Sequence, residues 1–182
     1  GAGTKGVNDD TADGFSKEKV DRIIQSLADG TYTPNPVRRK YIQKKQNSTK
    51  KRPLGIPTFT DKLVQEVLRM ILESVYEPIF SNNSHGFRPN RSCHTALKSL
   101  KREFSGVSWF IEGDIKGCFD NISHNWLMEN IPMDKSVLKQ FLKAGFVFRG
   151  ELFPTEDGTP QGGVISPLLA NMAPVSYTHL TL

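Results

Sequence analysis

Asp114–Asp120, with the sequence DIKGCFD, is the stretch that tells most about the fold of this chain. It begins inside an apolar run, Trp109–Ile115, whose side chains alternate between two faces with the period of a β-strand. We therefore expect a strand that ends near Asp114. The end of a strand is a rigid position for a carboxylate that binds a hard cation such as Mg²⁺. This stretch alone leaves a structural alternative open, in which Asp114 and Asp120 only cap the helix that follows.

A glycine-rich loop, Gly158–Gly163 with the sequence GTPQGG, lies further along the chain. Its backbone N–H groups and the amide of Gln161 suit a close approach to a sugar or a base. The loop lacks the Lys-Ser/Thr ending of a P-loop and the spacing of a dinucleotide-binding fingerprint. These departures disfavour a simple ATPase or dehydrogenase, and an ordinary turn is the alternative.

Positive charge is concentrated between Gly30 and Thr60, where no acidic residue occurs. The basic residues there are Arg38, Arg39, Lys40, Lys44, Lys45, Lys50, Lys51 and Arg52. The pattern predicts two strands, Val37–Gln43 and Arg52–Ile56, around a polar turn at Gln46–Thr49. A basic hairpin of this kind favours contact with nucleic acid or nucleotides, and a solvated surface is the alternative.

A polar loop, Ser84–Arg91 with the sequence SHGFRPNR, combines two guanidinium groups with an aromatic ring. This composition suits contact with a nucleic-acid backbone and stacking on a base. The histidines His85, His94 and His124 lack metal-ligand spacing, so we expect them to be hydrogen-bonded structural residues. The two cysteines lie far apart and have no identified base partner, which disfavours a disulfide framework and a thiol nucleophile.

Helices are predicted on both sides of these motifs. One begins after Ser16 and ends at Gly30, and the clearest runs from Asp61 to Pro78 with apolar residues at i, i+3 and i+4. Further helices are predicted after Ser92, Ser123 and Asp134 and near Ser166, with a short hairpin around Arg149-Gly150. Irregularly mixed helices and strands in 182 residues, of which 37% are hydrophobic, predict a folded α+β protein.

The order of four segments closely resembles bacterial group II intron reverse transcriptases. The segments are Arg52–Thr58 (RPLGIPT), Ser84–Pro89 (SHGFRP), Asp114–Ile122 (DIKGCFDNI), and Gly158–Gly163 (GTPQGG) with Ser166–Asn171 (SPLLAN). The leader Gly1–Asp13 is similar to the extra N-terminal segment of that family, so the resemblance covers residues 1–173. It implies the fingers and partial palm of a right-hand polymerase, with the extra segment and fingers in residues 1–106 and the partial palm in residues 107–173.

The resemblance also implies a catalytic centre. Asp114 would bind catalytic Mg²⁺ with the carbonyl of Ile115 as a further ligand, and the complete enzyme would use two such ions. Residues of the following turn would contact the incoming nucleotide; these are Lys116, Gly117, Cys118 and Phe119. Phe119 would be the steric gate that rejects a ribose 2′-hydroxyl.

Further contacts with nucleotide and RNA are implied in the same way. Gln161 would lie against the sugar of the nucleotide, while Arg52 and Lys44 would hold its triphosphate. Arg88 and Arg91 would lie near the RNA template. The charge of the basic hairpin adds Arg38, Arg39, Lys50 and Lys51 as candidate RNA contacts.

The implied activity is RNA-directed DNA polymerisation by an intron-encoded protein that also binds RNA and assists splicing. Its partners would be an intron RNA template, a DNA primer or target DNA, and deoxynucleoside triphosphates. The net charge of +5 agrees with polyanionic partners, and no apolar run approaches the roughly 18 residues of a membrane span. We expect a bacterial cytoplasmic protein that associates with the nucleoid through its substrate, and a homodimer is left open.

Two departures from the family concern the end of the chain. The family continues from the Ser166–Asn171 helix to a Tyr-Ala-Asp-Asp hairpin, and no such hairpin occurs before Leu182. Residues 174–182 no longer resemble the family, so we expect a truncated or chimeric reading frame there. A fragment with most of its metal site missing should be inactive on its own.

Two other functions are weighed against a group II intron polymerase. The first is a non-catalytic maturase that only binds intron RNA. The second is another prokaryotic reverse transcriptase of the retron, diversity-generating or CRISPR-associated type. The segments Arg52–Thr58 and Ser84–Pro89 favour the intron type over these relatives.

Overall fold

The computed structural model describes residues 3–44, 49–109 and 111–178. Its α-helices are α1 (Lys17–Ala28), α2 (Phe59–Tyr76), α3 (Cys93–Glu103), α4 (His124–Asn130), α5 (Lys135–Lys143) and α6 (Ser166–Thr178). Its strands are β1 (Val37–Gln43), β2 (Lys51–Ile56), β3 (Phe146–Phe148) and β4 (Glu151–Phe153). Short 3₁₀ turns occur at Ala12–Gly14, Glu77–Ile79 and Cys118–Asp120. The prediction of a mixed α+β fold is confirmed.

The helices begin at side chains that cap them. The hydroxyl of Ser16 accepts the backbone N–H of Lys19 at the start of α1, and Ser92 forms a capping box with Thr95 at the start of α3. The helix expected to start at Asp61 begins two residues earlier, because Thr58 is its N-cap. Ser123 and Asp134 cap α4 and α5 in the same way, as their sequence positions predicted.

The strands form one sheet in the order β2-β1-β3-β4. The basic hairpin is confirmed, since β1 and β2 pair antiparallel from Arg38 opposite Ile56 to Gln43 opposite Lys51. Positions 46–48 of the predicted turn lie outside the described residues. The second hairpin, β3–β4, is also confirmed, and β3 pairs parallel with β1 at Val37 and Arg38. That parallel pairing joins the two hairpins, and the sequence did not predict it.

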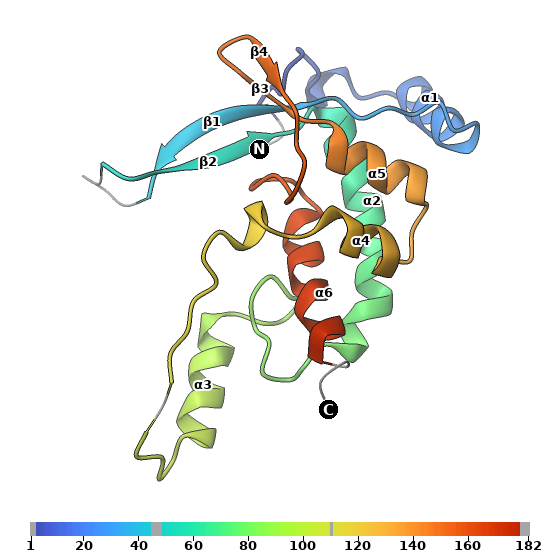
Figure 1. Cartoon of the computed structure of the whole chain (residues 1–182). Coiled ribbons are helices and arrows are strands. Elements are labelled where there is room, and N and C mark those ends of the chain that lie inside the picture. The colour runs from blue at the N-terminus through green and yellow to red at the C-terminus, as the bar shows by residue number, and fades with distance from the viewer. Residues whose placement is uncertain (1–2, 45–48, 110, 179–182) are drawn as a thin grey trace.

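The core lies between α2, α4, α5 and α6, below the sheet (Figure 1). Its most deeply buried side chains, all at most 4% exposed, include Leu72, Leu127, Ile131, Leu138, Leu142, Leu169 and Met172. Helix α3 stands away from this cluster, as Figure 1 shows. The amide of Asn171 on α6 donates to the carbonyl of Gly86, which ties the loop before α3 back to the core.

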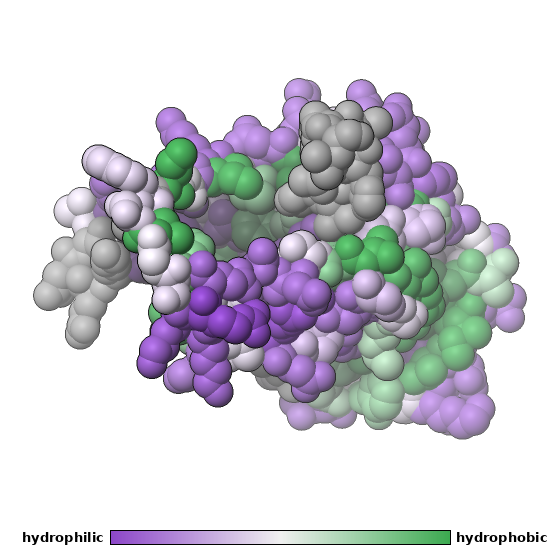
Figure 2. All heavy atoms as spheres, turned by 90° about the horizontal axis from the view of Figure 1, so that it is seen from below, coloured by the Kyte–Doolittle hydropathy of each residue, from purple (hydrophilic) through white to green (hydrophobic). Residues whose placement is uncertain are grey.

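The predicted apolar stripe of α2 is covered only in part. Val64 and Leu72 are buried, whereas Val67, Ile71 and Val75 are each more than half exposed. Seen from below, the molecule has hydrophobic patches separated by a hydrophilic band (Figure 2). Among the described residues, no helix is both long and apolar enough to cross a membrane.

The predicted strand at Trp109–Ile115 is wrong for the part of this run that the structure describes, which excludes position 110. No described residue there is assigned to a strand. Trp109 and Ile111 are almost completely exposed, and Ile115 is 68% exposed. A strand is stabilised by hydrogen bonds to a neighbour and by burial of one face, and the described chain supplies this run with neither.

Candidate functional site

The turn after Asp114 and the glycine-rich loop are about 40 residues apart in sequence, yet backbone hydrogen bonds join them. The N–H of Gly158 donates to the carbonyl of Ile122 over 2.8 Å, and the N–H of Thr159 donates to the carbonyl of Phe119 over 2.7 Å. The ring Nε2 of buried His124 lies 2.7 Å from the carbonyl oxygen of Gly158. His124 is therefore a structural residue, as its lack of metal-ligand spacing predicted.

Gly158 is required at this junction for two reasons. Its φ of +80° lies in the region that favours glycine. A Cβ atom at this position would lie 2.5 Å from the carbonyl oxygen of Phe119. Only a glycine lets the loop approach the turn this closely.

The same loop also runs along the outer edge of β2. The N–H of Gly55 donates to the carbonyl of Gln161 over 2.6 Å. A Cβ on Gly162 would lie 2.6 Å from the carbonyl oxygen of Gly55, so the backbones touch there. The loop thus brings Gln161 beside the hairpin that carries Arg52, while its other end holds the backbone of Phe119.

A buried glutamine on α2 fixes the end of this loop, and sequence reasoning missed it. The side-chain oxygen of Gln65 accepts the N–H of Val164 over 2.8 Å, and Gln65 is 4% exposed. A polar residue next to Val64 inside the apolar pattern of α2 was the available signal. Buried amides of this kind are almost always hydrogen-bonded.

Another missed feature is a buried network at the base of β1. Asp61 is 1% exposed and accepts the hydroxyl groups of Tyr32 and Thr58, each over 2.6 Å, and the N–H of Asn35 over 3.1 Å. Burial, and next to it the charge of Asp61, raise the pKa of the Tyr32 phenol above its usual range. The network joins the segment that enters β1 to the first turn of α2.

The hairpin register separates its basic residues onto two faces. Arg52 lies opposite Ile42, and the N–H of Lys44 donates to the carbonyl of Lys50 one step beyond the strands. Because side chains alternate along a strand and paired residues share a face, one face carries Arg38, Lys40, Lys44, Lys50 and Arg52. The opposite face carries Arg39 and Lys51. The two residues predicted to hold the triphosphate, Lys44 and Arg52, thus share a face.

Two of the predicted RNA contacts have partners within the chain. Arg38 donates from Nε and Nη2 to the carbonyl of Lys5, over 3.1 and 2.7 Å. The guanidinium of Arg39 lies 3.3 Å from the ring centre of Phe146. Lys50 and Lys51 lie exposed at the far end of the hairpin, and their contact with RNA stays a prediction.

The loop before α3 is held by Arg88, whose side chain is only 3% exposed. Its Nη2 donates to Glu77 over 2.8 Å, and its Nη1 donates to the carbonyls of Ser81 and Ser84. The structure therefore gives Arg88 a structural role, because its donors are already used. Arg91 bonds to Asn82 and remains partly exposed, so RNA contact from this loop is proposed for Arg91 alone.

Asp114 lies on the exposed segment before the turn, beside exposed Ile115. The capping alternative is wrong, because Gly117 is the N-cap of the 3₁₀ turn and Ser123 caps α4. Gly117 has a φ of +63°, and its carbonyl accepts the amide of Asn121 over 2.8 Å. Lys116 is exposed and Cys118 is a free, partly buried cysteine.

The metal donors in the described part of the chain are incomplete for two ions. No group of three or more His, Cys, Asp or Glu residues converges there. One exposed carboxylate and one main-chain carbonyl suit Mg²⁺ as ligands, since it prefers oxygen, but they cannot hold a pair of ions. The Asp114 assignment therefore stays a prediction.

Residues 42–175 match the family model described as reverse transcriptase (RNA-dependent DNA polymerase). The matched stretch contains β2, the turn after Asp114 and the glycine-rich loop. The chain belongs to the reverse transcriptase family. Its resemblance to fingers and partial palm is thereby confirmed, whereas the boundaries at 106 and 173 stay predictions. Reverse transcriptases of this family generally depend on divalent metal ions.

Proteins whose names refer to introns are similar to this reverse transcriptase chain. The group II intron-encoded protein LtrA of Lactococcus lactis subsp. cremoris is 63% identical over 98% of the chain, which covers 30% of LtrA. An uncharacterized 91 kDa protein in the cob intron of Schizosaccharomyces pombe is 44% identical over 97% of the chain and 22% of its own length. Nuclear intron maturase 1 of Arabidopsis thaliana is 40% identical over 45% of the chain and 12% of its own length. The chain thus spans about a third or less of the length of these relatives.

Proposed function

We propose that this chain is part of a group II intron reverse transcriptase that copies intron RNA into DNA and assists splicing. The observation that carries the proposal is the hydrogen-bonded junction of the glycine-rich loop with the Phe119 turn and the edge of β2. It gathers three segments that the resemblance assigns to the nucleotide. Similarity to LtrA supports the intron type over other prokaryotic reverse transcriptases.

In this proposal, the chain's own residues bind and select the nucleotide. Arg52 and Lys44, on one face of the hairpin, hold the triphosphate and offset the negative charge that grows on the departing pyrophosphate. Phe119 closes the space that a ribose 2′-hydroxyl would need. Gln161 lies against the sugar, in a loop whose backbone is fixed to Gly55.

Two Mg²⁺ ions, when bound in the complete protein, would activate the primer hydroxyl and stabilise the leaving oxygens. Asp114 and the carbonyl of Ile115 would contribute ligands to them. The remaining carboxylates would come from outside the described residues.

The proposed partners are an intron RNA template, a DNA primer or target DNA, and deoxynucleoside triphosphates. Lys50, Lys51 and Arg91 would contact RNA phosphates. A location in the bacterial cytoplasm, on nucleoid-associated substrate, is proposed from similarity to a bacterial intron protein. Self-association of two copies is part of the same proposal.

The test places residues 1–173 of this chain in LtrA in place of the aligned stretch. We expect the chimera to extend a DNA primer on an RNA template. Asp114→Asn should lower that activity at least about 100-fold by removing a metal ligand, while RNA affinity stays within about twofold. Glu112→Gln, a neutralised neighbour on the same exposed segment, is the matched control and should keep the activity.

A non-catalytic maturase is the second candidate, and the similarity to nuclear intron maturase 1 of Arabidopsis thaliana is the observation that favours it. It predicts that the chimera supports intron splicing without extending primers. Equal primer extension by Asp114→Asn and Glu112→Gln would overturn the assignment of Asp114.

A further inference from the structure

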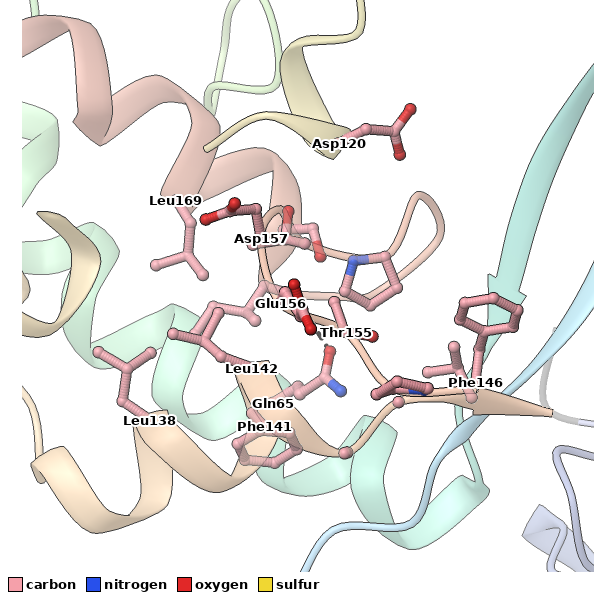
Figure 3. Close-up of a pocket in the computed structure, with 18 of the residues that line it drawn as sticks. Gln65, Asp120, Leu138, Phe141, Leu142, Phe146, Thr155, Glu156, Asp157 and Leu169 are labelled. Atoms are coloured by element: carbon pink, nitrogen blue, oxygen red, sulfur yellow. Dashed lines mark hydrogen bonds between the residues drawn. The ribbon is translucent and has the colours of Figure 1, made fainter. Parts of the chain in front are cut away.

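A pocket of about 200 Å³ lies at the base of the basic hairpin, between the strands and α5 and α6 (Figure 3). Leu138, Phe141 and Leu142 of α5 line one side, and Phe146 of β3 lines another. An engineered apolar cavity of about 150 Å³ is large enough to bind benzene. The pocket therefore has room for one substituted ring.

Two residues that line the pocket each carry a buried polar atom without a partner among the described residues. The hydroxyl of Thr159, a residue only 4% exposed, has no hydrogen-bond partner among the described residues. The Nε of Arg39 is buried and equally unpartnered there, although its guanidinium stacks on the ring of Phe146. A buried donor without a partner is costly, so both groups point to a ligand that supplies an acceptor.

The charged residues of the pocket define that ligand further. Asp120, Glu156 and Asp157 also line it, so the lining carries three carboxylates and a single guanidinium. Figure 3 shows Glu156 beside the hollow that Phe141, Leu142 and Phe146 surround. This excess of negative charge disfavours a phosphate or a carboxylate and favours a cation at the mouth.

We propose that this pocket binds a small amphiphile with one aromatic ring, a carbonyl-type acceptor at one end and a protonated amine at the other. The ring packs against Leu142 and Phe141. The carbonyl accepts from Arg39 Nε and the Thr159 hydroxyl, and the amine lies by Glu156. This ligand site is separate from the face of the hairpin that carries Lys44 and Arg52, and it does not depend on polymerase activity.

The first test titrates the 182-residue chain with 4-(aminomethyl)benzamide, followed by nuclear magnetic resonance of the backbone amides. We expect saturable binding with a Kd on the order of 1 mM or tighter, with the largest shifts on α5 and the loop before Gly158. 4-Methylbenzylamine, which lacks the carbonyl, should bind about 3- to 10-fold more weakly. 4-Methylbenzamide, which lacks the amine, should bind about 2- to 5-fold more weakly.

Variants then locate the site. Ala144→Leu fills the pocket from the end of α5 and should abolish saturable binding, while Thr159→Val should weaken it about 3- to 10-fold and keep the backbone bond to Phe119. Thr33→Val, an exposed threonine outside the pocket, is the matched control and should leave the Kd unchanged. Unfolding curves of each variant check that it is folded.

Three results would overturn the proposal. The first is no saturable binding to the folded parent chain. The second is equal affinity for all three probes, which would mean that the polar groups take no part. The third is full binding by folded Thr159→Val and folded Ala144→Leu, which would place the ligand elsewhere.

Discussion

The glycine-rich loop and the segment that carries Asp114 are held in opposite ways. Gly158–Gly163 is joined by its backbone to the Phe119 turn and to β2, and Gln65 fixes the residue after it. Residues 107–109 and 111–116 are exposed throughout. The two stretches carry equally specific motifs. What differs is whether the described chain supplies a partner for the backbone.

The residues assigned to the nucleotide and the residue assigned to the metal therefore differ in how firmly the described chain holds them. The part of the site assigned to the nucleotide is stabilised by contacts among the described residues. The part assigned to the metal has a suitable ligand but no neighbouring strand to fix it. A rigid position for Asp114 therefore requires contacts that the described residues do not make.

The largest effect on stability is expected for Gly158→Ala, and Gly113→Ala is the matched control. Gly158→Ala forces a Cβ against the carbonyl of Phe119 at positive φ, so the free energy of unfolding should fall by about 3 kcal/mol or more. Gly113→Ala, on the exposed segment, meets no atom within 4 Å and should change it by less than about 0.5 kcal/mol. Urea denaturation of the two variants measures both values, and equal losses would contradict the contrast.

The two arginines of the loop before α3 give a second pair of substitutions, one at a buried side chain and one at a partly exposed side chain. Arg88→Met leaves Glu77 and two carbonyls without their donor and should cost about 2 kcal/mol of stability. Arg91→Met should cost less than about 0.5 kcal/mol, because Arg91 is partly exposed. Thermal unfolding distinguishes them, and the proposal for Arg91 adds a loss of RNA affinity for that variant only.

The Tyr32–Asp61 network predicts a pH dependence. Because the pKa of Tyr32 is raised in the folded chain, the folded state keeps a proton that the unfolded state loses above pH 10, so this contribution to stability falls as the pH rises past that value. Tyr32→Phe should cost about 1 kcal/mol at neutral pH and flatten the decline above pH 10. Urea denaturation from pH 8 to 11 tests this, with exposed Tyr41→Phe as control. An unchanged slope in Tyr32→Phe would contradict it.

The smallest expected effect concerns the exposed end of the hairpin. Replacing Lys50 and Lys51 with Gln should lower the salt dependence of affinity for a single-stranded RNA by about 0.7 in slope per lost contact. The control replaces Lys17 of α1 and Lys139 of α5 with Gln, which removes the same amount of positive charge outside the hairpin. A fluorescence titration at several salt concentrations measures the slopes, and equal changes in both double variants would make the hairpin an ordinary solvated surface.

Sequence patterns predicted the local elements well. Capping residues such as Ser16 and Ser92 and the two hairpins act within a few residues, so their signals are visible in the chain. The parallel pairing of β1 with β3 was not predictable, because it joins residues more than a hundred positions apart. The strand at Trp109–Ile115 failed for the same reason, since its pattern is correct but a strand also needs a partner.

The same distinction between local signals and long-range contacts applies to the site residues. The glycine-rich loop and the Phe119 turn were found by motif, and only the structure joins them. Arg88 was predicted to contact RNA because it is an arginine in a polar loop, and only the structure shows its ion pair with Glu77. Gln65 and Asp61 were missed because a buried polar residue leaves little trace in an apolar pattern.

The bond between Gly55 and Gln161 also protects the sheet from adding further strands. β2 is an edge strand, and the backbone groups of Lys51, Pro53 and Gly55 face away from β1. Pro53 has no N–H to offer, and that of Gly55 is taken by the loop. The remaining position, Lys51, places a charge where an incoming strand would bury it. Mispairing with another chain and aggregation through this edge are therefore disfavoured by the same contact that orders the loop.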